Sequence, residues 1–169
     1  YGNQPCMQMA YLFNYSGAPW LTQKWSRAVI DSVYSGLSPQ YGYSGDEDQG
    51  LMGSLAVLMK IGIFSMRGGA EEKPIYELGS PIFDEIKIHL NPKYYPGKTI
   101  TIQTKNNSAT NRYIQSASFN GKVLTKPWFY HADFVKGAVL RLTMGDKPNK
   151  AWGAKVSEAP PSMSSEINN

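Results

Sequence analysis

The sequence predicts an α+β fold in which helices come first and antiparallel strands follow. Three observations support this prediction. Apolar residues recur at helical spacing before Gly68-Gly69, whereas apolar and polar residues alternate after it. Asn120-Gly121 lies between two strand-like runs, and this pair favours the two-residue turn of a β-hairpin. Because helices and antiparallel strands occupy separate parts of the chain, the pattern is typical of the α+β class.

The part of the chain before the glycine pair is predicted to contain three helices. Residues 5–16 are apolar at most positions, and Pro5 suits a first helical turn. A second helix is expected over residues 20–34, where apolar side chains follow one another at steps of three and four. A third helix should begin near the acidic residues 46–48 and end at about residue 63 or 64.

The second part is predicted to consist of strands. Each strand alternates apolar and polar residues, as expected for a sheet with one buried face, and the clearest examples cover residues 85–90, 99–103 and 139–144. From about Val156 the sequence has no apolar periodicity, so the end of the chain is expected to be frayed.

Composition excludes several classes of protein. Of the 169 residues, 41% are hydrophobic and 18% are charged, which is enough to form a packed core. The net charge of +4 is spread along the chain without a run of basic residues, so we expect no nucleic-acid partner. Cys6 is the only cysteine, which excludes an internal disulfide. No apolar stretch approaches the ~20 residues of a membrane span.

Three adjacent carboxylates, Asp46, Glu47 and Asp48, precede the long apolar run of the third predicted helix. One interpretation is helix capping, because the free N–H groups of a helix N-terminus favour acidic residues. The other is chemistry. A pair of carboxyl groups hydrolyses glycosidic bonds, and clustered acidic side chains bind calcium. Both interpretations remain open on the pattern alone.

Other catalytic signals are weak. His89 and His131 lie far apart without metal-ligand spacing to Cys6, so we interpret both as structural or exposed. Aromatic residues are frequent in the first part, and most should belong to the core. Some could line a sugar-binding cleft, since aromatic rings pack against the C–H faces of sugars.

Five motifs, taken in order, resemble those of the family 92 glycoside hydrolases, which are α-mannosidases. The resemblance extends to about Gly153, and five ordered motifs at matching spacing make it specific. The motifs are GNQP (2–5), YLFNYSGAPWLTQ (11–23), GDEDQG (45–50), YELGSPIFDEIKIHL (76–90) and YIQSASFNGK (113–122).

The resemblance implies that the chain contains the final helices of an (α/α)6 toroid, followed by an antiparallel β-rich C-terminal region. We therefore expect a helical part of the catalytic toroid at residues 1–67, an antiparallel β region at 68–153 and a flexible tail at 154–169. Since the chain begins with Tyr1 inside a motif, we expect it to be a C-terminal fragment.

The implied activity is calcium-dependent, inverting hydrolysis of terminal α-mannosides of glycans. By resemblance, Asp46 and Asp48 are the candidates for the general base, with Asp48 favoured. Asn3 and the same two aspartates are the candidate calcium ligands. Gln4 and Trp20 are the candidate substrate-binding residues. The expected partners are mannose-containing glycans and the remainder of the parent chain.

The resemblance places the general acid upstream of the GNQP motif, so this chain would supply the base but not the acid. The isolated fragment is therefore expected to be inactive. Family members commonly act outside the cytoplasm, which implies a secreted, periplasmic or cell-surface location.

The sequence departs from the family pattern in three places. Gln4 stands where the family usually has glutamate, residues 6–9 (CMQM) replace a stretch that usually carries histidines, and Leu51 replaces a glutamine. These differences keep an alternative open, in which the protein is a noncatalytic or degenerate member that acts as a glycan-binding or structural module.

Overall fold

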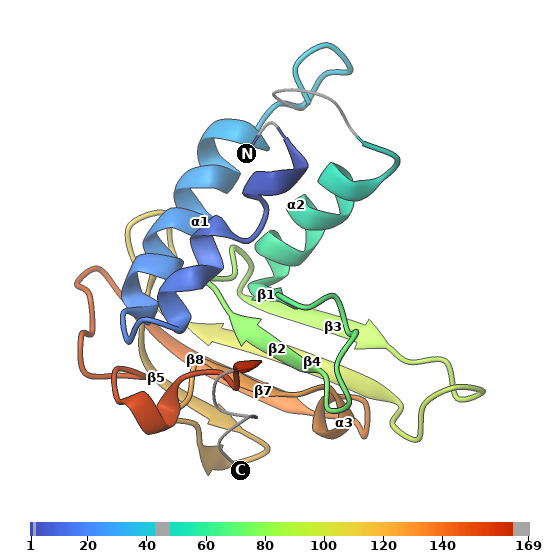
Figure 1. The fold of residues 1–169 in the computed structure, drawn as a ribbon, viewed down its shortest axis with the longest axis vertical. Coiled ribbons are helices and arrows are strands. Elements are labelled where there is room, and N and C mark those ends of the chain that lie inside the picture. The colour runs from blue at the N-terminus through green and yellow to red at the C-terminus, as the bar shows by residue number, and fades with distance from the viewer. Residues whose placement is uncertain (2, 43–47, 164–169) are drawn as a thin grey trace.

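Helices stand above two β-sheets in the computed structural model, which describes residue 1, residues 3–42 and residues 48–163 (Figure 1). The short 3-10 helices are labelled η. In chain order the elements are η1 (Gln4–Cys6), η2 (Met9–Asn14), α1 (Pro19–Val33), α2 (Leu51–Ile61), β1 (Ile63–Phe64), β2 (Ile75–Leu78), β3 (Glu85–His89), β4 (Thr99–Lys105), β5 (Tyr113–Phe119), β6 (Lys122–Val123), β7 (Trp128–Tyr130), α3 (His131–Phe134), β8 (Val139–Gly145) and η3 (Val156–Glu158).

The first predicted helix is wrong in type. Residues 5–16 contribute to η1 and η2, two separate 3-10 segments, instead of one α-helix. The short segment η2 buries three of its residues, Ala10, Tyr11 and Asn14. A 3-10 helix is usually a short piece of this kind. The Asn14 side chain donates a hydrogen bond to the Leu78 carbonyl at 3.0 Å, which fixes the end of η2 on strand β2.

The other two helices form close to their predicted places. Helix α1 begins with Pro19 in its first turn, where the missing N–H of proline costs nothing. Helix α2 begins later than predicted, at Leu51, because Asp48, Gln49 and Gly50 all have positive φ angles (54°, 61° and 91°), which no α-helix allows. It ends at Gly62, so residues 63 and 64 form strand β1 and not the end of a helix.

The strands form a three-stranded sheet of order β1-β2-β7 and a five-stranded sheet of order β3-β4-β8-β5-β6. All described pairings are antiparallel except β4 with β8, which run parallel. The predicted hairpin is confirmed: Asn120 and Gly121 have φ angles of 50° and 79° and connect β5 to β6. The α+β class with a β-rich C-terminal region is therefore correct.

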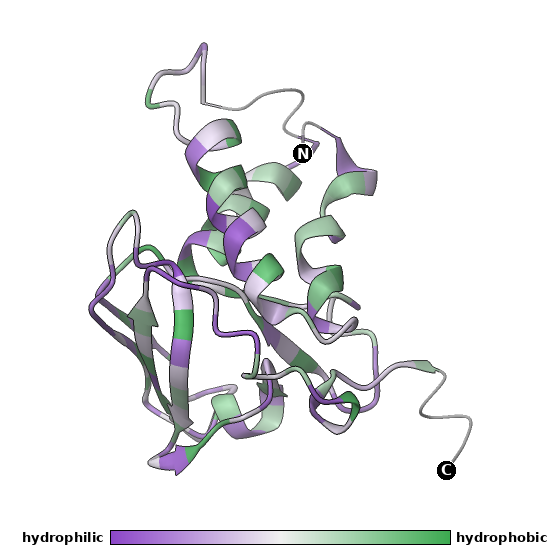
Figure 2. Cartoon of the chain, turned by 90° about the vertical axis from the view of Figure 1, so that its left-hand side faces the viewer, coloured by the Kyte–Doolittle hydropathy of each residue, from purple (hydrophilic) through white to green (hydrophobic). Residues whose placement is uncertain are grey.

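Two hydrophobic clusters divide the core. One lies within the helical layer and centres on Tyr11, Met52 and Met59. The other joins the two sheets through side chains such as Leu78, Ile102 and Leu140. Figure 2, turned by 90°, shows the helices above the sheets with apolar residues along both.

Residues 156–163 make specific contacts, whereas the sequence predicts a frayed end from Val156. Residues 156–158 form η3, and the Trp128 indole donates a hydrogen bond to the Glu158 carbonyl at 3.0 Å. Arg67 similarly donates to the Pro161 carbonyl at 3.2 Å. The division of the chain into units at residues 67 and 153 stays a prediction.

Candidate functional site

Asp48 lies directly before α2 with a half-buried side chain and a φ angle of 54°. Its backbone carbonyl accepts a hydrogen bond from the Leu51 N–H at 3.2 Å. The capping interpretation is wrong for this residue, because Gly50 is the N-cap of α2 and the first turn of α2 has no acidic residue. Within the described part of the chain, no side chain caps the helix. Asp46 and Glu47 lie outside the described residues.

The backbone at Asp48 is unusual. Asp48 and Gln49 are consecutive non-glycine residues in the left-handed region, which such residues seldom occupy. Backbone of this kind is common where a side chain must be held in one orientation for binding or catalysis. The conformation therefore favours a chemical role for the carboxylate of Asp48.

Asn3 and Gln4 lie far before the acidic loop in the sequence but belong to the same helical layer. Asn3 is exposed and extended (φ −151°), and its carbonyl accepts a hydrogen bond from the Cys6 N–H at 3.1 Å. Its side chain does not cap η1. Gln4, the first residue of η1, is also exposed.

Tyr34, at the C-terminal end of α1, brings these two segments together. Its hydroxyl lies 3.2 Å from the Tyr1 carbonyl oxygen and 3.3 Å from the Met52 sulfur, and its side chain is only 4% exposed. Tyr1 lies two residues before Asn3, and Met52 lies four residues after Asp48. The structure therefore places Asn3, Gln4 and Asp48 at one end of the helical layer.

Trp20 lies elsewhere. It is the second residue of α1, and the 15-residue helix separates it from Tyr34 by about 20 Å. Its ring packs against the ammonium group of Lys150 at 5.3 Å. The structure thus does not bring Trp20 to the end of the layer where Asn3 and Asp48 lie, and its role in substrate binding stays a prediction.

The donor atoms of Asn3 and Asp48 suit calcium, which prefers amide, carboxylate and carbonyl oxygens. Calcium takes six to eight such ligands, so these two side chains provide only part of a complete set. Among the described residues, no group of three or more histidine, cysteine or acidic side chains is arranged to hold a metal. His131 instead lies with Nδ1 3.2 Å from the Tyr76 hydroxyl.

Glu77 is a buried charged residue that the sequence analysis missed. It lies on β2 between Tyr76 and Leu78, where simple alternation predicts exposure, yet its side chain is 0% exposed. Its carboxylate accepts a hydrogen bond from the Tyr15 hydroxyl at 2.6 Å and another from the Met66 N–H at 3.1 Å. Burial raises the pKa of the Glu77 carboxyl above its usual range.

Arg27 is a second buried charge without a clear sequence signal. Its Nε donates to the carbonyl and the hydroxyl of Ser80, at 3.1 and 3.0 Å, and its Nη2 donates to the Pro81 carbonyl and to the Asn107 side chain. Burial lowers the pKa of Arg27 to about 10, so the group remains charged at neutral pH. Arg27 therefore connects α1 to residues 79–81, which lie between β2 of one sheet and β3 of the other.

Comparison with known proteins defines the class of the molecule. Residues 1–146 match the family model of a glycosyl hydrolase catalytic domain, that of family 92. The chain is thus part of a glycoside hydrolase catalytic domain. The chain belongs to glycosyl hydrolase family 92.

Relatives agree with this assignment. An uncharacterized secreted glycosidase from Arthroderma benhamiae is 33% identical over 168 residues, which are 98% of this chain and 20% of the relative. A family GH92 α-mannosidase from Bacteroides thetaiotaomicron superposes with a TM-score of 0.86 and 33% identity, covering 96% of this chain and 21% of that one. The same α-mannosidase is also known in complex with mannoimidazole.

A family GH92 inverting mannosidase from the same bacterium superposes with a TM-score of 0.84 and 34% identity, covering 97% of this chain and 21% of that one. The chain therefore spans about a fifth of the length of these relatives. Within its described residues, no helix is both long and apolar enough to cross a membrane.

Proposed function

We propose that this chain forms the general-base side of a calcium-dependent, inverting exo-α-mannosidase that hydrolyses terminal α-mannosides of glycans. The similarity to an α-mannosidase of known structure carries the proposal, since it covers 96% of the chain at a TM-score of 0.86. One similar structure is described as an inverting mannosidase, which supports the proposed stereochemistry. The proposed partners are mannose-containing glycans and the remainder of a longer parent chain.

Asp48 is proposed to act as the general base, together with Asp46. An inverting glycosidase uses one carboxylate to take a proton from the attacking water and one carboxylic acid to protonate the leaving oxygen. The two groups stand roughly 6.5–9.5 Å apart, which leaves room for the water. The left-handed backbone at Asp48 supports this role, because a base must be held within hydrogen-bond reach of that water.

Asn3 and Asp48, with Asp46, are the proposed calcium ligands from this chain. A bound calcium would orient and polarise hydroxyl groups of the sugar. The exposed Asn3 side chain, which does not cap η1, supports the assignment. Gln4, next to Asn3, is proposed to contact the substrate.

The proposal is tested by Asp48→Asn in the protein that carries this sequence within a complete catalytic domain. Removing a general base lowers the rate by about 100- to 10,000-fold, so we expect a loss of this size in kcat for a 4-nitrophenyl α-mannoside. The matched control is Asp84→Asn, because Asp84 is an exposed aspartate beside β3. An unchanged rate in Asp48→Asn, with the melting temperature preserved, would remove Asp48 as the base.

A second candidate function is noncatalytic glycan binding. It is favoured by Leu51, which stands where the resemblance expects a glutamine and packs against the apolar cluster of the helical layer. Under this alternative the protein would bind methyl α-mannoside without hydrolysing any α-mannoside. Asp48→Asn would then change no rate, because the parent protein already shows no turnover.

We also propose that the protein acts outside the cytoplasm, at the cell surface, in the periplasm or in the medium. The support for this location is a relative that is described as a secreted glycosidase.

A further inference from the structure

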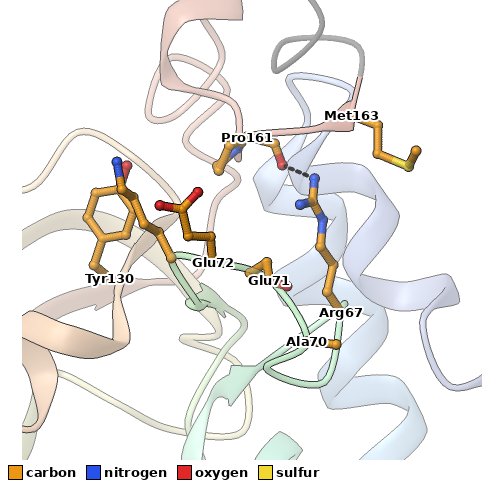
Figure 3. Close-up of a pocket in the computed structure, with 8 residues that line it drawn as sticks. Arg67, Ala70, Glu71, Glu72, Tyr130, Pro161 and Met163 are labelled. Atoms are coloured by element: carbon orange, nitrogen blue, oxygen red, sulfur yellow. Dashed lines mark hydrogen bonds between the residues drawn. The ribbon is translucent and has the colours of Figure 1, made fainter.

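A pocket of about 860 Å³ lies apart from the sequence-predicted site, and none of the candidate residues Asn3, Gln4, Trp20 and Asp48 lines it (Figure 3). It is lined by the connection between β1 and β2, by Tyr130 at the end of β7, and by Pro161 and Met163. This volume is in the range of small-molecule sites. The lining residues used below are Arg67, Glu71, Glu72, Lys73, Tyr130 and Pro161.

Specific contacts hold the walls of this pocket in place. Arg67 donates a hydrogen bond to the Pro161 carbonyl at 3.2 Å, which joins the β1–β2 connection to the C-terminal segment (Figure 3). The Tyr130 ring packs edge-on against Trp128, with ring centres 5.1 Å apart and planes at 88°. Trp128 is anchored in turn by its hydrogen bond to the Glu158 carbonyl. The tyrosine ring is therefore a fixed, 38% exposed aromatic surface.

The charges of the lining residues balance. Arg67 and Lys73 provide two positive charges, and Glu71 and Glu72 provide two negative ones. A pocket built for phosphate or for a cation would carry an excess of one sign, since complementary charge is what attracts an ionic ligand. The balance favours a neutral ligand that offers both hydrogen-bond donors and acceptors.

One lining group lacks a partner. Glu71 Oε1 accepts a hydrogen bond from the Ile75 N–H at 3.2 Å, but Glu71 Oε2 is buried and has no partner among the described residues. Buried carboxylate oxygens are rarely left without a donor. Nearby, the Glu72 carboxylate points into the space between Tyr130 and Pro161 (Figure 3). The buried Glu71 oxygen is closed off from the pocket, whereas the exposed Glu72 carboxylate can accept hydrogen bonds from hydroxyl groups.

We propose that this pocket binds a neutral pyranose of a glycan, with the sugar ring against Tyr130 and its hydroxyl groups hydrogen-bonded to Glu72. A pyranose matches the lining because it combines an apolar C–H face with several hydroxyl groups and carries no charge. The choice of mannose as the probe rests on the proposed function, whereas the sugar class follows from the pocket itself.

The test is a titration of the isotopically labelled protein with methyl α-D-mannopyranoside, followed by backbone amide chemical shifts. We expect shifts at Ala70, Glu71 and Tyr130, and an affinity about fivefold weaker in Tyr130→Ala, since an aromatic contact contributes about 0.5–1.5 kcal/mol. Tyr130→Phe keeps the ring and should bind as the parent does. The matched control is Tyr94→Ala, because Tyr94 is 69% exposed on the β3–β4 connection.

Any of three results would overturn the proposal. The first is the absence of any shift of the pocket amides at about 100 mM sugar, and the second is a shift of these amides with inorganic phosphate in place of the sugar. The third is an equal loss of affinity in Tyr94→Ala and Tyr130→Ala. The readout is independent of turnover. A complete catalytic domain that carries this sequence and shows these shifts but does not hydrolyse α-mannosides would contradict the proposed function alone. Hydrolysis that depends on Asp48 without these shifts would contradict only the pocket proposal.

Discussion

Glu77 illustrates how single side chains hold the helical layer on the sheets. A buried carboxylate loses its hydration, and this loss is offset only where hydrogen bonds replace the water. Tyr15, just beyond the end of η2, and the backbone of Met66 provide two such bonds. They do not fully compensate, because burial and the nearby Glu71 carboxylate still raise the pKa of Glu77 above 4.5.

This raised pKa gives a prediction about pH. The folded state binds the Glu77 proton more tightly than the unfolded state does, so the contribution of Glu77 to stability is complete below about pH 4.5 and declines as the pH rises through its folded-state pKa. Glu77→Gln stays neutral at every pH and loses one of the two hydrogen bonds, worth about 1 kcal/mol. We therefore expect the stability advantage of the parent over Glu77→Gln to shrink between pH 4 and pH 7.

Urea unfolding of both proteins at several pH values measures this difference, and taking the difference cancels the other titrating groups. Glu72→Gln is a suitable control, because it makes the same chemical change at an exposed residue, where substitutions usually alter stability by no more than about 0.5 kcal/mol. An advantage of the parent that grows with pH would contradict the assigned direction of the pKa shift.

The candidate site was only partly predictable at the level of single residues. The sequence motifs predicted roles for Asn3 and Asp48, and the structure places both residues at one end of the helical layer through Tyr34. The separation of Trp20 could not be foreseen, because it depends on which end of α1 meets the start of the chain. Nothing in the local pattern distinguishes the buried Glu77 from an exposed strand glutamate.

At the level of elements, glycines with nearly equal φ angles flank α2. Gly50 (φ 91°) precedes the helix and Gly62 (φ 87°) ends it. A Cβ at Gly50 would meet no atom within 4 Å, whereas a Cβ at Gly62 would lie 2.6 Å from the Pro81 nitrogen. The same substitution therefore tests backbone strain alone at one end and strain plus a steric clash at the other.

We expect Gly50→Ala to lower the free energy of unfolding by about 1–2 kcal/mol, the cost of a left-handed alanine. Gly62→Ala should cost about 3 kcal/mol or more, since the Pro81 backbone must also move. Chemical unfolding of both variants measures the two costs. Equal losses would show that the contact between the end of α2 and Pro81 does not constrain the helix.

The elements that local signals predict best are the strands. Alternation located β3, β4 and β8, and the Asn120-Gly121 pair located the hairpin, because both signals are short-range. The parallel pairing of β4 with β8 joins segments more than 30 residues apart and has no local signature. The boundary of α2 was misplaced because an acidic cluster is favourable before a helix whether or not its residues adopt helical angles.

At the scale of the whole molecule, side chains connect the helical layer to both sheets. Asn14 bonds to Leu78 on β2, Gln23 accepts from the Ile114 N–H of β5 at 2.8 Å, and Arg27 binds the Ser80–Pro81 segment between the sheets. These bonds are buried, where hydrogen bonds are strongest. The end of the layer that carries Asn3 and Asp48 is therefore positioned by the β-rich region as well as by the helices.

The last prediction concerns what these 169 residues can do by themselves. Inverting hydrolysis needs a proton donor as well as a base, and by resemblance the donor lies in a part of the family domain that precedes these motifs. The chain spans about a fifth of the α-mannosidases that it matches. We expect the 169-residue polypeptide alone to release mannose from α-mannosides at least about 100-fold more slowly than a protein that carries it within a complete catalytic domain, since proton donation contributes at least that factor. Chromatographic detection of free mannose measures both rates, and Asp48→Asn in each protein identifies turnover by a contaminant. Comparable turnover by the isolated chain, abolished by Asp48→Asn, would show that it contains its own proton donor.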